Sequence, residues 1–227
     1  MKTINMSKSL LVLIVTVIAF SGCKKDLQFS KATYWPLIKV IGPDYVVVPV
    51  GTGYTDSSAD VSVNSKPISF TTTSTVDTAT TGVYTVVYSA VNEDGISASQ
   101  TRTVVVVNTA AAADDLTGTY QRTNGANPKT NWAKDPDRPY AYLANNPGGV
   151  NNDPAFDATF SVYNVEPGVV VVPLQTVGSL APFFCSASLG GSTKISFNVS
   201  AAVGDVAYAW VLNGANFGTV LRTFIKR

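Results

Sequence analysis

The sequence predicts an all-β protein built from two consecutive β-rich modules. Charged residues make up only 14% of the 227 residues, while Val, Thr, Ser, Gly, Asn and Tyr are abundant. This mixture favours β-strands joined by tight turns. Apolar and polar residues also alternate with a period of two in several stretches, whereas no 3.6-residue apolar period persists after the N-terminal segment.

The N-terminal segment has the features of a secretory signal. Lys2 and Lys8 precede an apolar run from Leu10 to Phe20, and small residues follow it. A membrane-spanning helix needs roughly 20 apolar residues, and this run has about half that number. A basic start, a short apolar middle and small residues at the end are typical of a signal peptide.

Residues 20–23, Phe-Ser-Gly-Cys, resemble the lipobox of bacterial lipoproteins, in which the cysteine is acylated and becomes the first residue after cleavage. The first lipobox position is usually Leu, so Phe20 departs from the pattern. The alternatives are an ordinary signal peptide with an unrelated cysteine and a short anchor helix. The resemblance implies a signal peptide at residues 1–22, a lipid on Cys23 that binds the membrane, and a tether over residues 23–35.

The net charge and the residue counts exclude several functional classes. Without Lys2 and Lys8, 14 basic residues face 15 acidic ones, so the chain offers no basic surface to nucleic acid. It has no histidine, which excludes Ser-His-Asp and Cys-His catalysis and removes the commonest zinc ligand. With Cys23 acylated, Cys185 has no disulfide partner, and its apolar context predicts a buried, inert thiol. We expect neither a cofactor nor a metal.

The first module is predicted to span residues 36–108. Its clearest feature is a hairpin over residues 82–107, whose first strand carries on one face Tyr84, Val86, Tyr88 and Ala90. The turn Asn-Glu-Asp-Gly at residues 92–95 joins the two strands. Further strands are predicted at residues 45–50 and 68–73, and this series of short strands indicates a small β-sandwich.

Two stretches of this module, "VPVGTGYTDSSADVSV" and "GVYTVVYSAVNEDGISASQTRTVVV", resemble the Ig-like repeats of bacterial surface proteins. The matching residues are Gly53, Tyr54, Asp56, Gly82, Tyr84, Val86, Tyr88, Ala90, Thr101, Arg102 and Thr103. The resemblance implies an N-terminal Ig-like β-sandwich that lacks the buried disulfide of antibody domains. In relatives, such modules mostly act as spacers that lift a second domain off the membrane.

Residues 109–115, within "NTAAAADD", are predicted to be a linker, although four alanines would also suit a helix. Residues 116–227 then form a second β-rich module, either a β-sandwich or a barrel-like domain. Its strands are predicted at "LTGTYQRTNG" and at residues 157–164, 169–173, 194–200, 207–213 and 219–225. Residues 169–172 are apolar on both faces, which indicates a strand covered on both sides.

The whole chain resembles two-module lipoproteins of the Bacteroidota whose C-terminal domain has no assigned function. The resemblance rests on "DLTGTYQRTNG", "NNPGGV", "SVYNVEPGVVVVPLQ" and the lipobox. Such lipoproteins often accompany polysaccharide-uptake machinery, so the resemblance implies an outer-membrane lipoprotein that handles glycans beside a transporter-associated protein partner. Whether it faces the cell surface or the periplasm stays open, because "CKKD" offers only one of the acidic residues that favour surface export.

Residues 124–153 are the richest segment for ligand binding, with seven asparagines and three aspartates beside three aromatic residues. Trp132, Tyr140 and Tyr142 are predicted to stack on the apolar faces of sugars. The predicted hydrogen-bonding partners of the sugar hydroxyls are Asn131, Asp135, Asp137, Asn145 and Asn146. A long irregular loop is unusual in a compact domain unless it functions or is disordered. The alternative is that Asn, Gly and Pro only form turns and that the rings belong to the core.

The carboxylates give little support for an enzyme. A glycosidase needs two of them about 5–10 Å apart, but Glu93 is predicted at a hairpin tip and Glu166 in the turn "VEPG". Asp135 and Asp137 are close enough in sequence to share a calcium ion, although Asp-Pro is also a common turn starter. "DTA" at residues 77–79 resembles the O-glycosylation acceptor pattern of the Bacteroidota and marks Thr78.

These observations favour a lipid-anchored envelope protein that binds carbohydrate without catalysis. The alternative is a structural or adhesive envelope protein whose partner is another protein. Glycan binding requires an exposed aromatic surface, whereas adhesion requires a larger apolar patch or an open sheet edge.

Overall fold

The structure is a computed structural model that describes residues 32–124, 128–150, 158–214 and 220–227. The predicted signal peptide and the predicted lipid site Cys23 lie outside the described residues. The described chain consists of strands and one short 3-10 helix, so the predicted all-β fold class is confirmed. Among these residues, no helix is long and apolar enough to cross a membrane.

Two sheets form the N-terminal module. The first has the strand order β1 (Leu37–Val40), β3 (Ala59–Val63), β4 (Lys66–Pro67). The second has the order β2 (Tyr45–Pro49), β7 (Ser97–Val107), β6 (Gly82–Val91), β5 (Thr71–Ser74). Strand β2 runs parallel to β7, and the other pairs are antiparallel. Apolar side chains of both sheets form one core, as a β-sandwich requires.

The hairpin of β6 and β7 confirms the predicted alternation. Alternate side chains from Val86 to Ala90 are buried, and those between them are partly exposed. In the turn, Gly95 has a φ of 79°, a conformation that glycine adopts without strain. The side-chain oxygen of Asn92 accepts a hydrogen bond from the backbone N–H of Ile96 at 2.7 Å and fixes the turn.

A buried ionic network crosses this sandwich. Arg102, which is only 1% exposed, forms an ion pair with Asp56 and donates to the Tyr88 hydroxyl at 2.8 Å. Its Nε donates to the carbonyl oxygen of Pro43 at 2.9 Å. Tyr54 and Tyr88 both donate their hydroxyl protons to the Asp56 carboxylate. A buried charge is tolerated when it is paired and hydrogen-bonded. In this network the two charges pair with each other, and the two tyrosine hydroxyls provide further hydrogen bonds.

The segment predicted as a linker is a hydrogen-bonded 3-10 helix, η1 (Thr109–Ala113), capped by Asn108. Beyond the helix, the carboxylate of Asp114 accepts hydrogen bonds from Asn164 Nδ2 at 3.0 Å and from the backbone N–H of Gly168 at 2.8 Å. The chain between the modules is therefore hydrogen-bonded to the C-terminal module at Ala111 and Asp114.

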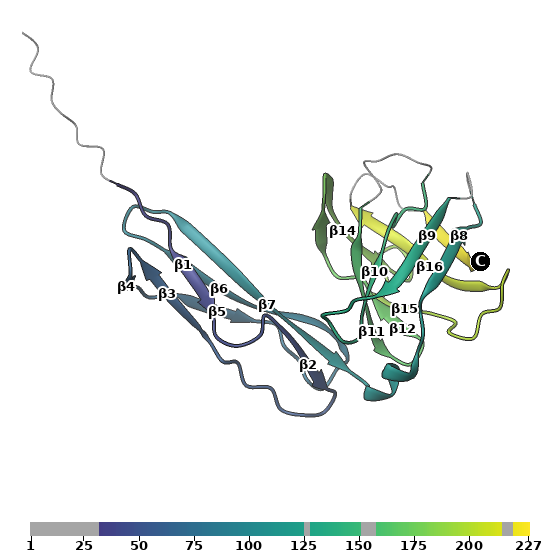
Figure 1. Ribbon diagram of the computed structural model, residues 1–227, viewed down its shortest axis with the longest axis horizontal. Coiled ribbons are helices and arrows are strands. Elements are labelled where there is room, and N and C mark those ends of the chain that lie inside the picture. The colour runs from purple at the N-terminus through teal and green to yellow at the C-terminus, as the bar shows by residue number, and fades with distance from the viewer. Residues whose placement is uncertain (1–31, 125–127, 151–157, 215–219) are drawn as a thin grey trace, which may run out of the picture. The chain divides into compact units, whose positions relative to one another are not determined.

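The C-terminal module is one antiparallel sheet of ten strands (Figure 1). Their order in the sheet is β13 (Gln175–Val177), β14 (Leu180–Ser186), β16 (Val206–Gly214), β17 (Leu221–Lys226), β8 (Gly118–Arg122), β9 (Lys129–Lys134), β10 (Ala141–Ala144), β11 (Phe160–Glu166), β12 (Val169–Val171), β15 (Lys194–Ser196). Directly after β15, Phe197 bridges Tyr208 of β16, and Asn198 N–H donates to the Ala207 carbonyl at 2.7 Å. The sheet thus curls into a nearly closed barrel, the second of the two predicted architectures.

The closed part of the sheet runs from β16 to β15 and leaves out β13 and β14, so the barrel has about eight strands. Aromatic side chains fill it, as expected for a barrel of this size, whose interior is just wide enough for side chains. Trp210 is fully buried, and its Nε1 donates to the carbonyl oxygen of Pro147 at 3.1 Å. The rings of Tyr208 and Phe224 stack with their centroids 4.7 Å apart. Cys185 is also fully buried, so the predicted burial of its thiol is confirmed, and burial raises the pKa of the thiol.

A third apolar cluster, the intermodule cluster, joins the sandwich to the barrel. Its buried members are Val105, Val107, Ala141, Tyr163, Val165 and Val171. Along residues 104–107 of β7, alternate valines enter the sandwich core and the intermodule cluster. In the same way, Val170 of β12 faces the barrel core and Val171 faces the cluster. The prediction of a strand covered on both sides is confirmed, because each of these strands separates two apolar layers.

Candidate functional site

The segment predicted as a long binding loop is mostly a β-hairpin. Strands β9 and β10 pair within it and are joined by a turn at residues 135–140. Its Asn and Pro residues favour turns, yet residues 129–132 alternate between exposed and buried as a strand does. The prediction of an irregular loop is therefore wrong for the hairpin. Residues 125–127 and 151–153 of the segment lie outside the described residues.

Two of the three predicted aromatic residues are unavailable for stacking. Trp132 and Tyr142 are 3% and 4% exposed. The Trp132 ring packs against Tyr208 with the centroids 5.0 Å apart, and the Tyr142 hydroxyl donates to the backbone oxygen of Asp114 at 2.9 Å. Both rings belong to the barrel core. The prediction that they form a glycan-stacking surface is wrong, because that role requires exposed rings.

The predicted asparagines lie at the opposite end of the hairpin and hold its backbone. Asn145 Oδ1 accepts from the backbone N–H of Asn131 at 2.7 Å, and Asn146 Oδ1 accepts from Val150 N–H at 3.0 Å. Asn146 has a φ of 48°, which asparagine tolerates better than most residues. Four residues of strand, about 13 Å at 3.3 Å each, separate these asparagines from the predicted aspartates.

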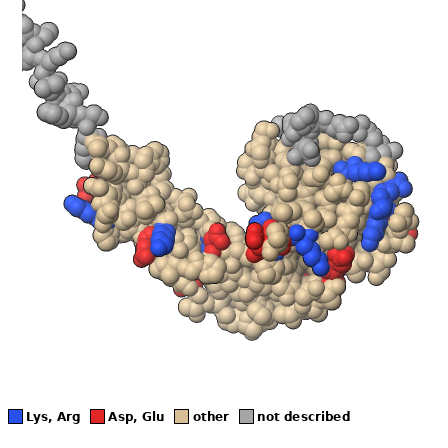
Figure 2. All heavy atoms as spheres, in the orientation of Figure 1, with Lys and Arg blue, Asp and Glu red and all other residues tan. Residues whose placement is uncertain are grey.

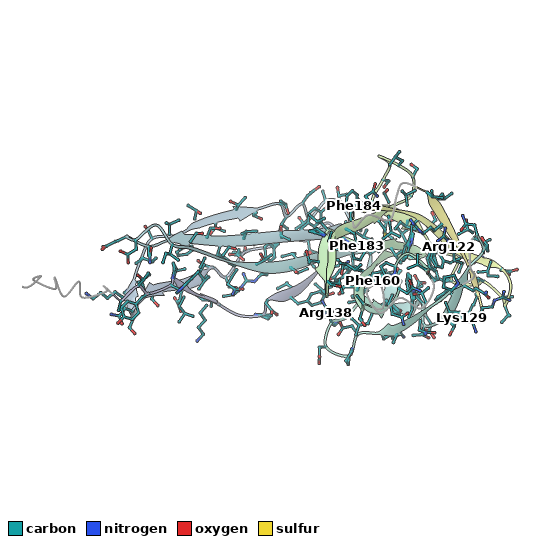
Figure 3. All side chains as sticks on the ribbon, turned by 90° about the horizontal axis from the view of Figure 1, so that it is seen from above. Arg122, Lys129, Arg138, Phe160, Phe183 and Phe184 are labelled. Atoms are coloured by element: carbon teal, nitrogen blue, oxygen red, sulfur yellow. The ribbon has the colours of Figure 1, made fainter. Side chains whose placement is uncertain are left out.

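The turn at residues 135–140 lies on the side of the barrel next to the N-terminal module, where Figure 3 labels Arg138. The Asp135 carboxylate pairs with Arg138 Nη2 at 2.5 Å and accepts the backbone N–H of Asp137 at 3.0 Å. Arg138 also donates to Ser161 Oγ at 3.1 Å. Burial alone would raise the pKa of Asp135, but the Asp137 N–H and the Arg138 guanidinium outweigh it and hold the pKa below its ordinary value.

Asp135 and Asp137 differ in their surroundings, and calcium binding by the pair stays a prediction. The first carboxylate is engaged by Arg138 and the turn backbone, whereas the second is exposed. In the part of the chain that the structure describes, no three side chains of His, Cys, Asp or Glu converge as metal ligands would.

A cleft of about 690 Å³ opens between this turn and the N-terminal module. We call it the junction cleft, and it is lined by Pro43, Asp44, Tyr45, Val47, residues 135–139 and Leu143. Tyr45 is partly exposed, and its ring stacks on Tyr163 with the centroids 6.3 Å apart. Its hydroxyl donates to the Pro139 carbonyl at 2.5 Å. Burial and the nearby Tyr163 raise the pKa of this hydroxyl, so it stays a hydrogen-bond donor at neutral pH.

A second hollow of about 200 Å³ adjoins the junction cleft, with Asp135, Arg138 and Pro139 in both linings. Tyr140 lines this second hollow and is the one predicted aromatic residue that is partly exposed. Its φ of 64° lies in the left-handed region, which is uncommon for a residue with a side chain and marks a tightly constrained turn. The structure thus brings together Asp135, Asp137 and Tyr140 from the predicted set.

Glu166 has a structural role that local sequence did not indicate. It ends β11 and pairs with Lys194 at 2.5 Å, and both side chains bond the hydroxyl of Thr81 in the N-terminal module. Glu166, predicted to lie in a turn, therefore takes part in a polar contact across the two modules. Figure 2 shows that most of the face it draws is uncharged. Glu93 is exposed at the hairpin tip, as predicted. Thr78 is partly exposed between β5 and β6, and its glycosylation stays a prediction.

Residues 38–106 match the family model of the Ig-like domain of bacterial surface proteins. The match runs from β1 to β7 and includes the network of Asp56 and Arg102. The N-terminal module is a bacterial surface Ig-like domain. Among solved structures, the chain is similar to the crystal structure of a lipoprotein from Bacteroides thetaiotaomicron, with 18% identity and a TM-score of 0.35 over 85% of this chain and 100% of that one. A likeness this weak carries no conclusion about this chain. A comparison with curated proteins finds no match.

The Ig-like domain contributes Tyr45 to the junction cleft, and local sequence carries no signal for that role. Tyr45 starts a strand of valines and has the pattern of an ordinary strand residue. Its hydrogen-bond partner Pro139 lies 94 positions away in the chain. Only the packing of the two modules makes the two residues neighbours.

Proposed function

We propose that this chain is a lipid-anchored protein of the bacterial cell envelope that binds carbohydrate without catalysis, in association with polysaccharide uptake. The family match of the Ig-like domain supports the envelope location, since such domains occur in bacterial surface proteins. The lipobox at residues 20–23 supports a lipid anchor on Cys23. A transporter-associated partner in the outer membrane belongs to the same proposal.

The junction cleft is the observation that carries the binding proposal. Its volume lies within the range of about 300–1,000 Å³ that is typical of small-ligand sites. Tyr45 offers an aromatic surface for the C–H face of a sugar ring, and Asp137 and Asp44 offer acceptors for its hydroxyls. The guanidinium of Arg138 offers donors and is held in place by Asp135 and Ser161.

The displaced pKa values of carboxyl groups give no support for hydrolysis. A glycosidase needs one carboxylic acid whose pKa is raised, so that it is protonated when it meets the substrate. In the described residues, each carboxyl group with a displaced pKa is displaced downward, namely Asp56, Asp115, Asp135 and Glu166. Asp135, the one of these groups that lines the junction cleft, stays ionised at neutral pH.

The proposal is tested by screening residues 24–227 on a glycan array together with Tyr45→Ala, Tyr45→Phe and Asp137→Ala. We expect binding to one polysaccharide class that is lost in Tyr45→Ala, retained in Tyr45→Phe and weakened in Asp137→Ala. The phenyl ring of Tyr45→Phe preserves stacking, while the hydrogen bond to Pro139 is lost.

Tyr84→Ala is the matched control for Tyr45→Ala. Tyr84 is also partly exposed in the Ig-like domain, its hydroxyl also donates to a backbone carbonyl, and it does not line the junction cleft. Thermal melts of each variant separate lost binding from lost folding. If folded Tyr45→Ala and folded Asp137→Ala both still bind, the site lies elsewhere. If the wild type binds no glycan on the array, the carbohydrate proposal is overturned.

The alternative of a protein-binding envelope protein is favoured by one observation. Trp35 and Leu37 are 71% and 68% exposed and lie two positions apart, just before and at the start of β1. Exposed large apolar residues that lie together mark interaction surfaces. Crosslinking in cells distinguishes the two functions, because a partner captured by the wild type and lost in Trp35→Ser would favour the alternative.

A further inference from the structure

The charged groups that line the junction cleft do not balance. Three carboxylates, of Asp44, Asp135 and Asp137, share the lining with one cation, Arg138. That cation is already paired, because Arg138 donates from Nε to the Asp135 carboxylate at 2.7 Å and approaches it with Nη2 at 2.5 Å. The pair is close to neutral for a ligand in the cleft, so Asp44 and Asp137 remain as two uncompensated negative charges.

These two carboxylates come from opposite sides of the cleft. Asp44 directly precedes β2 of the Ig-like domain, and its backbone oxygen accepts the N–H of Thr103 at 2.8 Å. Asp137 lies in the barrel turn, where its own N–H is bound by Asp135. Both residues are exposed, and within the described part of the chain neither carboxylate has an ion-pair partner.

The next charged side chain along the same wall belongs to the neighbouring hollow. Lys134 lines the second hollow and not the junction cleft. Groups in the cleft lining lie closest to a ligand bound there, and the effect of more distant exposed charges is screened over about 8 Å at physiological ionic strength.

We infer that the junction cleft selects uncharged or amino-bearing sugars and rejects polysaccharides with carboxylate or sulfate groups. The inference rests on the proposed function and specifies its ligand class. An anionic sugar placed between Asp44 and Asp137 meets two like charges without a free cation to offset them, whereas an ammonium group finds two acceptors of opposite charge. Neutral sugars meet the same oxygens as hydrogen-bond acceptors.

The test measures binding of residues 24–227, which include all described residues, to three chemical forms of matched oligosaccharides. The first set is neutral galactan, galacturonan and galactosaminan. The same neutral, uronic and amino forms are compared for each backbone that binds on the glycan array. The measured quantity is the ratio of dissociation constants within each matched set. We expect the uronic form to bind at least about tenfold more weakly than the neutral form, on the scale of two unit charges near 4 Å in water. The amino form should bind at least as tightly as the neutral form, and its advantage should shrink as salt rises.

The double variant Asp44→Asn, Asp137→Asn identifies the cause. It keeps the shape and one acceptor oxygen of each side chain and removes both charges, so we expect the ratio of uronic to neutral binding to approach one. Asp60→Asn is the matched control, because Asp60 is an exposed carboxylate of the Ig-like domain outside the cleft. That control should leave the ratio unchanged.

The outcomes separate the inference from the proposed function. If neutral and uronic forms bind equally well and the double variant leaves their ratio unchanged, the inference fails while carbohydrate binding stands. If no form of any backbone binds, the proposed function itself fails, and the inference falls with it. A ratio that Asp60→Asn shifts as much as the double variant would also overturn the inference, because net charge and not the cleft would then be responsible.

Discussion

Arg102 illustrates how one buried charge can organise a small β-sandwich. The residue is 1% exposed and pairs with Asp56 while it donates to Tyr88 and to a backbone carbonyl. Removing one partner of a buried pair is costly because the other charge is left without compensation. The sandwich has no disulfide that could offset such a loss, since Cys185 lies in the barrel.

We predict that Arg102→Met lowers the free energy of unfolding of residues 24–227 by about 3–5 kcal/mol. Chemical denaturation of residues 24–227 measures this change. Arg227→Met is the matched control, because Arg227 is exposed and its side chain donates to Gln121, and it should change stability by less than about 0.5 kcal/mol. A loss below about 1 kcal/mol for Arg102→Met would contradict a central role for the network.

The same network predicts a pH dependence. Burial alone would raise the pKa of Asp56, but hydrogen bonds from Tyr88, Ser58 and Tyr54 and the charge of Arg102 hold it below its ordinary value. Because the folded state has the lower pKa, the unfolded chain binds the proton more readily. This contribution to stability is complete above about pH 4 and is lost as the pH falls further. In Asp56→Asn, which is already destabilised at neutral pH, the loss of stability below about pH 4 should be smaller than in the wild type.

At the scale of single residues, exposure is what the sequence did not reveal. Trp132 and Tyr45 are both aromatic residues in strands. Nothing in their local sequence indicates that Trp132 lies in the core and that Tyr45 lines the cleft. Burial depends on which strands pack across the barrel and between the modules. The members of the buried network could be recognised from the sequence in part, because all four belong to the residues that carry the Ig-like resemblance, namely Tyr54, Asp56, Tyr88 and Arg102.

At the scale of elements, the turn between β11 and β12 controls the closure of the barrel. Gly168 has a φ of 66°, and its carbonyl oxygen accepts the N–H of Phe197 at 2.7 Å. A Cβ at this position would lie 2.9 Å from the backbone oxygen of Phe197. Phe197 in turn bridges Tyr208, the contact that brings the two sides of the sheet together.

We predict that Gly168→Ala destabilises the barrel by more than the cost of its backbone conformation alone. Gly95→Ala is the matched control, because Gly95 also has a positive φ, of 79°, but a Cβ at Gly95 would meet no other residue within 4 Å apart from its chain neighbours. The control should cost about 1–2 kcal/mol, and Gly168→Ala should cost clearly more because a backbone atom has to move. Equal losses in thermal denaturation would show that the close contact with Phe197 does not matter.

Strands were predictable where side chains alternate or are apolar on both faces. The hairpin of β6 and β7 follows its alternation, and the valines of β7 and β12 are apolar on both faces because they separate two cores. Strands β9 and β10 were missed because Asn and Pro favour turns. The order of the strands in the barrel could not be predicted either. Strand β8 pairs with β17, which lies about half of the chain away, and no short-range pattern encodes that contact.

At the scale of the whole molecule, the Ig-like domain and the barrel share a built interface. The intermodule cluster buries valines of β7 against Tyr163 and Val171, and the contact of Glu166, Lys194 and Thr81 adds a polar link. Residues 35–227 accordingly form one compact unit. A domain that acted only as a spacer would not need this interface.

We predict that residues 24–227 unfold in a single cooperative transition and that Val171→Asp divides it into two. The new carboxylate would be buried among apolar side chains, which costs several kcal/mol and separates the modules. Val91→Asp is the control, because Val91 is 60% exposed and should leave one transition. Calorimetry measures the number of unfolding transitions in the wild type and in each variant. Two transitions in the wild type would contradict the coupling of the two modules.

The central claim is that a glycan binds in the cleft that the two modules form together. Hydrogen–deuterium exchange of residues 24–227, with and without a polysaccharide selected on the array, tests it most directly. We predict slower exchange in peptides that cover residues 43–47 of the Ig-like domain and, at the same time, in peptides that cover residues 135–143 of the barrel. Protection confined to one module, or located at the opposite end of the hairpin around residues 128–131 and 145–150, would contradict it.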